Sequence, residues 1–272
     1  MSSPARSLNG VGPSWHAASH ESGRLVSVFE EAPELLRSLG PRAVAKAAGI
    51  TVPLLVAEPG PWLVPVLPGE ARGHLGLLTL EGLLLRRVKL GRRSGTELLG
   101  GGDLLQPWAP QPPYETLAVK HNWEVLERSR FAVLDGRFAA RVAPWPEVAA
   151  ALLERAIERT RTLAFQLAAS HIIGLERRLL VLMWALADRW GRVTAKGVLV
   201  PLQLTHITLA DLVGASRPSV STALAELARG DALERRPDGW LLHGRPPGGV
   251  QPGVNGEWVG AGWSATGAFV DH

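Results

Sequence analysis

The sequence predicts an α+β protein in which a β-rich N-terminal half precedes a long helical segment and a helix-turn-helix with a β-hairpin. Three observations predict this. From about residue 50 to residue 135, short apolar runs end at Gly or Pro, which is typical of a sandwich or a small barrel. Residues 146–192 carry apolar side chains three and four positions apart, which is the helical period. The stretch TLADLVGASRPSVSTALAEL, residues 208–227, has the residue spacing of a helix-turn-helix.

The composition limits the chemistry and the location of the chain. Its 272 residues suffice for one large domain or two ordinary ones, and a net charge of +4 makes it mildly basic. The absence of cysteine excludes disulfides, thiolate zinc sites and cysteine-ligated iron–sulfur clusters. The N-terminal residues lack the apolar segment of a signal peptide, and no apolar run reaches the about 18 residues of a membrane span. The sequence therefore predicts a cytoplasmic protein with no membrane partner.

The N-terminal half divides into an arm, a helix and a set of strands. Residues 1–23 are rich in Gly, Pro and Ser, which predicts a flexible arm. A short helix is expected at Pro33–Ala48. The runs that predict strands are PLLVAE (53–58), GLLTLEG (76–82), LLLRRVKLG (83–91), TELLGGGD (96–103) and FAVLD (131–135).

The helical segment is too long for one ordinary helix, and Gly174 is its natural break. Residues 146–173 have a narrow apolar seam flanked by charged residues, as in helices that associate in pairs. The seam consists of Leu153, Ile157, Thr160, Ala164 and Leu167. Two interpretations are open: the seam joins two copies of the chain, or the helix packs on its own domain.

The stretch 208–227 has the residues that two short helices need where they cross. Ala210 is small enough for the second helix to cross over it, Gly214 tolerates the positive φ of the turn, and Val220 is a β-branched anchor that points back. Thr208 and Ser216 are expected to cap the two helices, and Pro218 falls in the first turn of the second. After a connector at Gly191–Leu204, residues 232–244 read as strand, Pro-Asp-Gly turn and strand, which predicts a wing.

The outward side of the second helix predicts contact with DNA. A guanidinium and short hydroxyl side chains lie at the helix N-terminus, the end that such helices insert into the major groove. The expected DNA-binding residues are Thr208, Ser216, Arg217, Ser219, Ser221 and Thr222.

The rival hypothesis is a small-molecule sensor or a protein-interaction module whose winged helix does not bind DNA, and the local charge supports it. Within residues 205–247 the basic side chains are Arg217, Arg229, Arg235, Arg236 and Arg245, and the acidic ones are Asp211, Glu226, Asp231, Glu234 and Asp238. This segment is neutral, whereas phosphate binding usually leaves a basic footprint. Upstream basic residues that could supply one are Arg177, Arg178, Arg189, Arg192 and Lys196.

From about residue 50 to residue 244, the chain resembles the Crp/Fnr family of bacterial transcription regulators. The residues that carry the resemblance are Gly82 in LEGLLLRR, Gly102 and Asp103 in GGGDLL, the stretch LADLVGASRPSVSTALAEL, and LERRPDGWLL. The resemblance implies a cyclic-nucleotide-binding-like β-roll sensor of jelly-roll type at 24–145, a dimerisation helix at 146–173 and a winged helix-turn-helix at 174–245. Residues 246–272 read as a disordered tail.

The resemblance also implies roles for single residues. Arg217 matches the arginine that reads guanine in each half-site, whereas Pro218 and Thr222 replace side chains that read bases in better-known members. An effector pocket would be lined by Gly102, Asp103, Gln106, Trp108, Lys120 and His121. Cyclic-nucleotide binders of the family hold the phosphate with an arginine after the Gly-Asp pair. No arginine occurs between Arg93 and Arg128, so cAMP binding is not expected.

No other chemistry is predicted. The histidines His74, His121, His171 and His206 lack metal-ligand spacing, GGGD is not followed by the Lys-Ser/Thr of a phosphate loop, and no Gly-x-Ser-x-Gly is present. We therefore expect no catalytic residue, metal or cofactor and no enzymatic activity. The expected partners are double-stranded DNA and a second copy of the chain. The resemblance also allows RNA polymerase and an unidentified small-molecule effector.

Overall fold

The computed structural model describes residues 23–63, 73–91, 93–107 and 119–247. The chain forms two compact units. The N-terminal unit comprises Met1–Arg93 with Glu97–Thr160, and the C-terminal unit comprises Ser94–Thr96 with Arg161–His272. The predicted arm at 1–22, Trp108 of the expected effector pocket and the tail at 248–272 lie outside the described residues.

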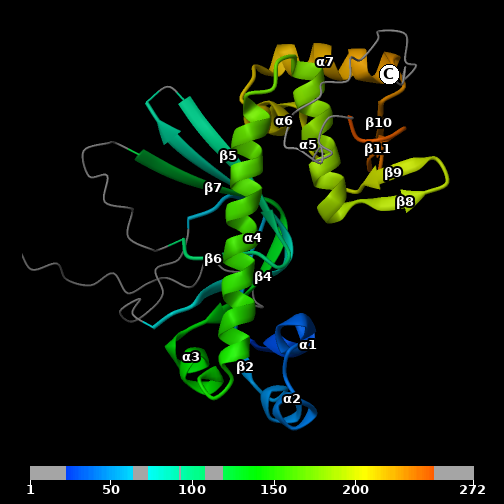
Figure 1. Ribbon diagram of the computed structural model, residues 1–272. Helices are drawn as coiled ribbons and strands as arrows, with labels where there is room; N and C mark the ends of the chain where they lie inside the picture. Colours follow the sequence, from blue (N-terminus) through cyan, green and yellow to red (C-terminus); the bar gives the residue numbers. More distant parts are fainter. Residues whose placement is uncertain (1–22, 64–72, 92, 108–118, 248–272) are drawn as a thin grey trace, which may run out of the picture. The chain divides into compact units, whose positions relative to one another are not determined.

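The N-terminal unit is built on one sheet of seven strands (Figure 1). Its main order is β1-β2-β7-β4-β5, with β3 paired to β7 and β6 paired to β4. The strands are β1 (Leu25–Ser27), β2 (Thr51–Ala57), β3 (Gly60–Pro61), β4 (Gly76–Leu90), β5 (Arg93–Gly100), β6 (Leu104–Leu105) and β7 (Val119–Leu134). The pairings of β7 with β2, β3 and β4 are antiparallel, as expected for a roll of short apolar runs.

Strand β4 corrects the prediction of two separate strands at 76–82 and 83–91. Gly82 does not end a strand; it marks an irregularity inside one, because the register with β7 shifts on both sides of it. Gly82 has a φ of +103°, and a Cβ there would lie 2.2 Å from Ser129 Oγ and 2.5 Å from Ser129 Cα. The glycine is required because β7 crosses so closely at this point.

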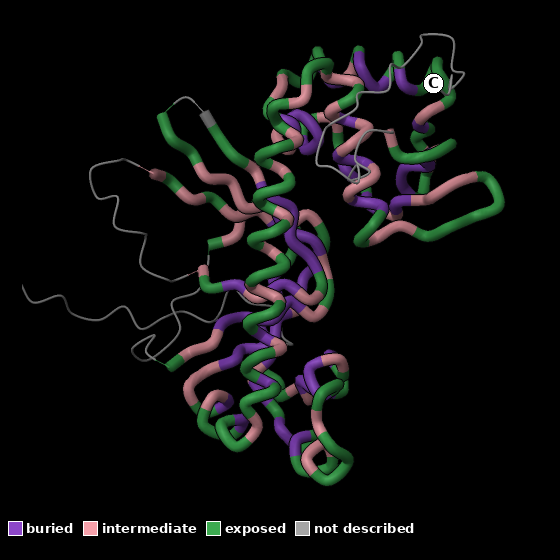
Figure 2. The backbone as a smooth tube through the Cα atoms, viewed as in Figure 1, coloured by how far each residue is buried: buried purple, intermediate pink, exposed green. Residues whose placement is uncertain are grey.

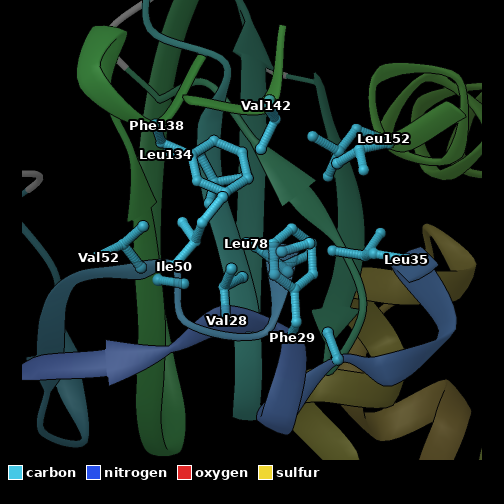
Figure 3. Packing of buried hydrophobic residues seen from close by; sticks show 14 of the residues in the cluster. Val28, Phe29, Leu35, Ile50, Val52, Leu78, Leu134, Phe138, Val142 and Leu152 are labelled. Carbon is cyan, nitrogen blue, oxygen red and sulfur yellow. The ribbon is translucent and has the colours of Figure 1, made fainter. Parts of the chain in front are cut away.

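Four short helices cover one end of this sheet: α1 (Val28–Glu31), the 3-10 turn η2 (Pro33–Leu36), α2 (Pro41–Ala47) and α3 (Gly136–Val142). The single helix expected at Pro33–Ala48 is wrong, because Gly40 is extended (ψ 159°) before Pro41 and proline disfavours a helical residue in front of it. Their apolar sides pack with the sheet and with the start of the long helix in one buried cluster (Figure 3). The cluster includes Val28, Phe29, Leu35, Ile50, Val52, Leu78, Leu134, Phe138, Val142 and Leu152.

The long helix α4 runs from Pro146 to Ser170, and α5 runs from Leu175 to Trp190. The break falls where the sequence predicts it. Gly174 precedes α5 with a φ of +90°, a conformation that favours glycine.

The C-terminal unit packs three helices against a second sheet. Its helices are α5, α6 (His206–Val213) and α7 (Arg217–Arg229), and its antiparallel strands have the order β10-β11-β9-β8. The strands are β8 (Arg192–Thr194), β9 (Gly197–Val200), β10 (Leu233–Arg236) and β11 (Gly239–Leu242). The predicted wing is confirmed as β10 and β11, but the predicted connector at Gly191–Leu204 is wrong in that it holds two strands. Within the described residues, no helix is long and apolar enough to cross a membrane.

Candidate nucleic-acid interface

Helices α6 and α7 form the helix-turn-helix around the three residues that predicted it. Ala210 and Val220 are buried, and Gly214 ends α6 in the left-handed region at a φ of +64°. The backbone N–H of Ala215 donates to the Ala210 carbonyl at 3.0 Å, which closes the turn. The remaining inward positions, Leu209, Val213, Leu224 and Leu227, are buried as well.

The caps of the two helices differ from the prediction at one residue. Ser216 caps α7, since its hydroxyl accepts from the Ser219 N–H. The cap of α6 is Thr205, not Thr208: the Thr205 hydroxyl accepts from the Thr208 N–H at 3.1 Å. Thr208 is buried, and its hydroxyl lies 3.0 Å from that of Thr205. Thr208 therefore holds the start of α6 and offers no exposed group to a ligand.

The hydroxyls on the outward side of α7 are bonded within the protein, whereas its guanidinium is exposed. Ser219 Oγ lies 2.8 Å from Ser216 Oγ, and Thr222 Oγ1 donates to the Pro218 carbonyl at 3.2 Å. The Thr222 hydroxyl thus has its donor committed, and one of the Ser216 and Ser219 hydroxyls donates to the other. Arg217 is exposed, and it forms no ion pair within the part of the chain that the structure describes. Arg217 is thus the predicted DNA-binding residue best placed to read a base edge.

A cavity of about 300 Å³ opens beside Arg217, and the sequence analysis did not foresee it. It is lined by Thr205, His206 and Ile207 from the start of α6, Arg217 from α7 and Arg235 from β10. Only Arg217 of these five residues was expected to bind DNA.

His206 and Arg235 are held in fixed positions at this cavity. His206 Nδ1 lies 2.8 Å from Ser221 Oγ, so the predicted DNA contact Ser221 is engaged with the histidine. The Arg235 guanidinium lies over the Trp240 ring, 5.2 Å from its centroid. Burial and the charges of Arg235 and Arg217 lower the pKa of His206 below its usual value. Two guanidiniums thus line the same cavity as the imidazole.

The neutral charge of residues 205–247 conceals an uneven arrangement. Arg229 is paired with Glu226, and Arg236 is 3.3 Å from Glu234. Arg217 and Arg235 lie on the cavity and have no carboxylate partner among the described residues. Glu226 and Glu234 thus compensate arginines outside the cavity, while Arg217 and Arg235 keep their positive charge within it.

The basic residues upstream of the helix-turn-helix differ in whether they are available to DNA. Arg178 donates to the carbonyls of Ile172 and Val213, both at 3.1 Å, and so ties the end of α6 to the turn before α5. Arg189 lies over Trp190 at 4.4 Å. Arg177, Arg192 and Lys196 are exposed.

The predicted seam residues of α4 are all exposed in the single chain. Leu153 is 60% exposed, Ile157 42% and Leu167 65%, and Thr160 and Ala164 are exposed between them. Figure 2 shows most of α4 as exposed or intermediate beyond its first turns. At about 100° per residue, the five positions span about 80° of the helix circumference. They form one narrow apolar stripe.

Two of the residues expected to line an effector pocket, Asp103 and Gln106, are bonded to backbone groups nearby. Asp103 is buried at the turn after β5, where its Oδ2 accepts from the Gly100 N–H at 2.7 Å and its carbonyl accepts from the Thr79 N–H. Gln106 donates to the Leu75 carbonyl at 2.9 Å.

Lys120 and His121 pair with Lys89 and Val88 on β4. These two residues lie ten and nine positions after Thr79, whose N–H donates to the Asp103 carbonyl. Gly102, Asp103 and Gln106 therefore shape a turn, while His121 lies 3.4 Å from Arg86 Nη2.

An ion-pair cluster inside the N-terminal unit is the strongest polar feature that the sequence analysis missed. Glu97 of β5 accepts from Arg159 of α4 at 2.6 and 2.8 Å, and Arg86 of β4 lies 3.6 Å from the same carboxylate. Burial lowers the pKa of Arg159, but the hydrogen bonds and charge of Glu97 outweigh it, so the pKa is raised. The three partners lie far apart in sequence, so no local pattern indicates them. No cluster of His, Asp and Glu among the described residues could hold a metal ion.

Comparison with known proteins gives a family for the C-terminal unit and a fold for most of the chain. Residues 176–244 match the family model of the Crp-like helix-turn-helix domain. The curated proteins contain no significant match.

Three solved structures are similar to the chain. A cyclic nucleotide-binding domain containing protein from Listeria monocytogenes aligns with a TM-score of 0.57 and 16% identity, over 78% of this chain and 97% of its own. A CooA mutant from Carboxydothermus hydrogenoformans aligns with a TM-score of 0.54 and 17% identity, over 77% of this chain and 89% of its own. A CRP/FNR-family transcriptional regulator from Thermus thermophilus aligns with a TM-score of 0.50 and 20% identity, over 70% of this chain and 93% of its own. At these identities the similarity establishes the fold.

Proposed function

We propose that this chain, a Crp/Fnr-type protein with a Crp-like helix-turn-helix domain, is a sequence-specific transcription regulator that binds a pseudo-palindromic operator as a homodimer. The observation that carries the proposal is the first turn of α7. There the cap at Ser216 is satisfied and Arg217 is exposed without a carboxylate partner among the described residues.

Arg217 is assigned the reading of a guanine in each half-site. A guanidinium donates two parallel hydrogen bonds to the O6 and N7 of guanine, and its position at the N-terminus of the second helix is the one that enters the major groove. Thr222, with its donor committed to the Pro218 carbonyl, and Ser219, which shares a hydrogen bond with Ser216, are assigned to acceptor contacts or to packing against the groove. Pro218 supports the helix start and contributes no hydrogen bond.

The apolar stripe on α4 is assigned to the dimer contact. A surface helix that exposes five seam positions in one narrow stripe has the pattern of a two-helix association. Two recognition helices related by a two-fold axis would meet half-sites about 34 Å apart, one turn of DNA.

Regulation by cAMP is not part of the proposal. The stretch 94–127 has no arginine to hold a cyclic phosphate, and Asp103 and Gln106 bond to backbone groups nearby. The sensing ligand, if the roll binds one, therefore differs from cAMP.

The proposal is tested by selecting bound duplexes from a randomised DNA pool with the purified protein, with and without cAMP. An enriched pseudo-palindrome in both arms is the expected result. Enrichment only with cAMP would refute the cAMP-independent part. Failure to enrich in either arm would favour a winged helix that binds protein partners.

Substitution of Arg217 then tests the base-reading assignment. In the selected duplex, Arg217→Ala should lose about 1–3 kcal/mol of discrimination at one base pair of each half-site and little at the others. The control is Arg229→Ala, which removes an exposed arginine at the far end of α7 that is already paired with Glu226. Equal losses at all base pairs would assign Arg217 to the DNA backbone instead.

A further inference from the structure

The cavity beside the recognition helix has the features of a site for one phosphate. His206 and Arg235 line it from two different elements, α6 and β10, and Arg217 adds a second positive charge at its edge. Ile207, more than half exposed, is the apolar part of the lining. A doubly cationic cavity with no carboxylate partner among the described residues is suited to an anion.

Both groups that would contact the anion are oriented before it arrives. Trp240 lies under the Arg235 guanidinium, with 5.2 Å from the guanidinium carbon to the ring centroid. Ser221 engages His206 Nδ1 at 2.8 Å, which fixes the imidazole and leaves Nε2 as the nitrogen without a partner among the described residues. Preorganised donors of this kind lose little side-chain entropy on binding.

We propose that His206 and Arg235 clamp a DNA backbone phosphate next to the base that Arg217 reads, and that His206 takes up a proton as the phosphate binds. This inference rests on the proposed DNA-binding function and adds two residues and a proton to it.

The hydrogen bond with Ser221 is compatible with both protonation states of His206. In the neutral state the Ser221 hydroxyl donates to Nδ1, and Nε2 carries the hydrogen. In the protonated state Nδ1 donates to the Ser221 oxygen while Nε2–H donates to the phosphate. The serine only has to rotate its hydroxyl.

The direction of the proton coupling follows from the charges around His206. Arg217 on α7 and Arg235 on β10 face the ring, the β11 neighbour Trp240 is uncharged, and no carboxylate among the described residues is within ion-pair distance of the ring. Without DNA, burial and the two arginines lower the pKa of His206. A phosphate cancels the positive field and accepts from Nε2, so the pKa rises in the complex. Affinity for DNA therefore increases as the pH falls.

The test compares wild type with His206→Gln, since glutamine retains hydrogen bonding to Ser221 but does not titrate. Affinity for the selected duplex is measured by fluorescence anisotropy from about pH 5.5 to about pH 8 at constant salt. As the pH is raised through the range in which His206 exchanges its proton, the affinity of wild type for DNA should fall by up to about tenfold per pH unit and per protomer. The affinity of His206→Gln should depend less on pH. The matched control His171→Gln, an exposed histidine after α4, should retain the wild-type profile.

Identical pH profiles for wild type and His206→Gln would overturn the proton coupling while leaving the DNA-binding function intact. Absence of binding by wild type at every pH would overturn both.

Two further measurements keep the inference testable if His206→Gln fails to fold. Arg235→Gln should reduce the salt dependence of binding by about one ion per protomer, equally for specific and unrelated duplexes. In the free protein, the same substitution should raise the pKa of His206, followed by the NMR titration of its ring protons. An unchanged His206 pKa would show that Arg235 does not act on this histidine.

Discussion

The ion-pair cluster at Glu97 gives the sharpest stability prediction. Glu97→Gln retains the shape of the side chain but removes the charge that two guanidiniums share. The Glu97 side chain is 8% exposed, and it accepts a bidentate pair from Arg159 at 2.6 and 2.8 Å while Arg86 lies at 3.6 Å. Burial and the neighbouring charge of Arg159 lower the pKa of Arg86 even though Glu97 opposes them. Without Glu97, the two cations would repel each other in a poorly hydrated place.

The expected cost is about 3 kcal/mol of unfolding free energy. Breaking a buried ion pair costs about 3–5 kcal/mol, and the lower end applies because Arg159 and Arg86 remain 18% and 28% exposed and gain some hydration. The measurement is urea unfolding followed by circular dichroism, with the free energy taken by linear extrapolation.

The matched control is Glu124→Gln, which breaks the more exposed pair between Glu124 and Arg87 on the same sheet. That substitution should cost less than about 1 kcal/mol. If Glu97→Gln and Glu124→Gln cost the same, the carboxylate of Glu97 does not carry the stabilisation assigned to it.

Two other substitutions test the sheet and the apolar stripe. Gly82→Ala should destabilise the N-terminal unit by more than about 2 kcal/mol, because Gly82 has a φ of +103° and its new Cβ would overlap Ser129. The measurement is urea unfolding, and the control is Gly95→Ala, whose Cβ would have no atom within 4 Å. A cost for Gly82→Ala no larger than that for Gly95→Ala would contradict the close crossing. Leu167→Lys should shift the protein toward monomer in analytical ultracentrifugation and weaken binding to a two-half-site operator, whereas a variant that stays dimeric with unchanged affinity would show that the stripe is not the dimer contact.

The helix-turn-helix could be predicted because local residue types determine it. Gly214 supplies the left-handed turn, Ala210 and Val220 fill the crossing, and Ser216 caps α7, all within eleven consecutive residues. The prediction erred on the cap of α6. Thr205 and Thr208 are both compatible with the sequence pattern, and only the actual start of the helix at His206 decides between them.

The sheet was predicted less well because a glycine can either end a strand or permit a close backbone crossing inside one. Gly82 was taken for the end of a strand, but it permits a close crossing inside β4, and the partner that requires it, Ser129, lies on a strand far along the chain. The strands β8 and β9 were missed because they are only three and four residues long and depend on partners elsewhere: β9 pairs with β11, and β8 pairs with β9.

The polar sites could not be predicted because their members come together only through the fold. Glu97 and Arg159 belong to a strand and to a helix sixty-two residues apart, and neither lies in a recognisable motif. The effector-pocket residues were grouped by resemblance, and the backbone bonds that hold Asp103 and Gln106 were not apparent from the sequence.

The charge of the winged helix shows why a count over a segment is a weak guide to its partner. Five basic and five acidic residues cancel in residues 205–247, yet an ion pair on the surface neutralises only the arginine that it contacts. Glu226 and Glu234 pair with Arg229 and Arg236, whereas the two arginines that line the cavity, Arg217 and Arg235, keep their charge there. A segment with no net charge can therefore present a positive site where two arginines, unpaired within the described residues, line one cavity.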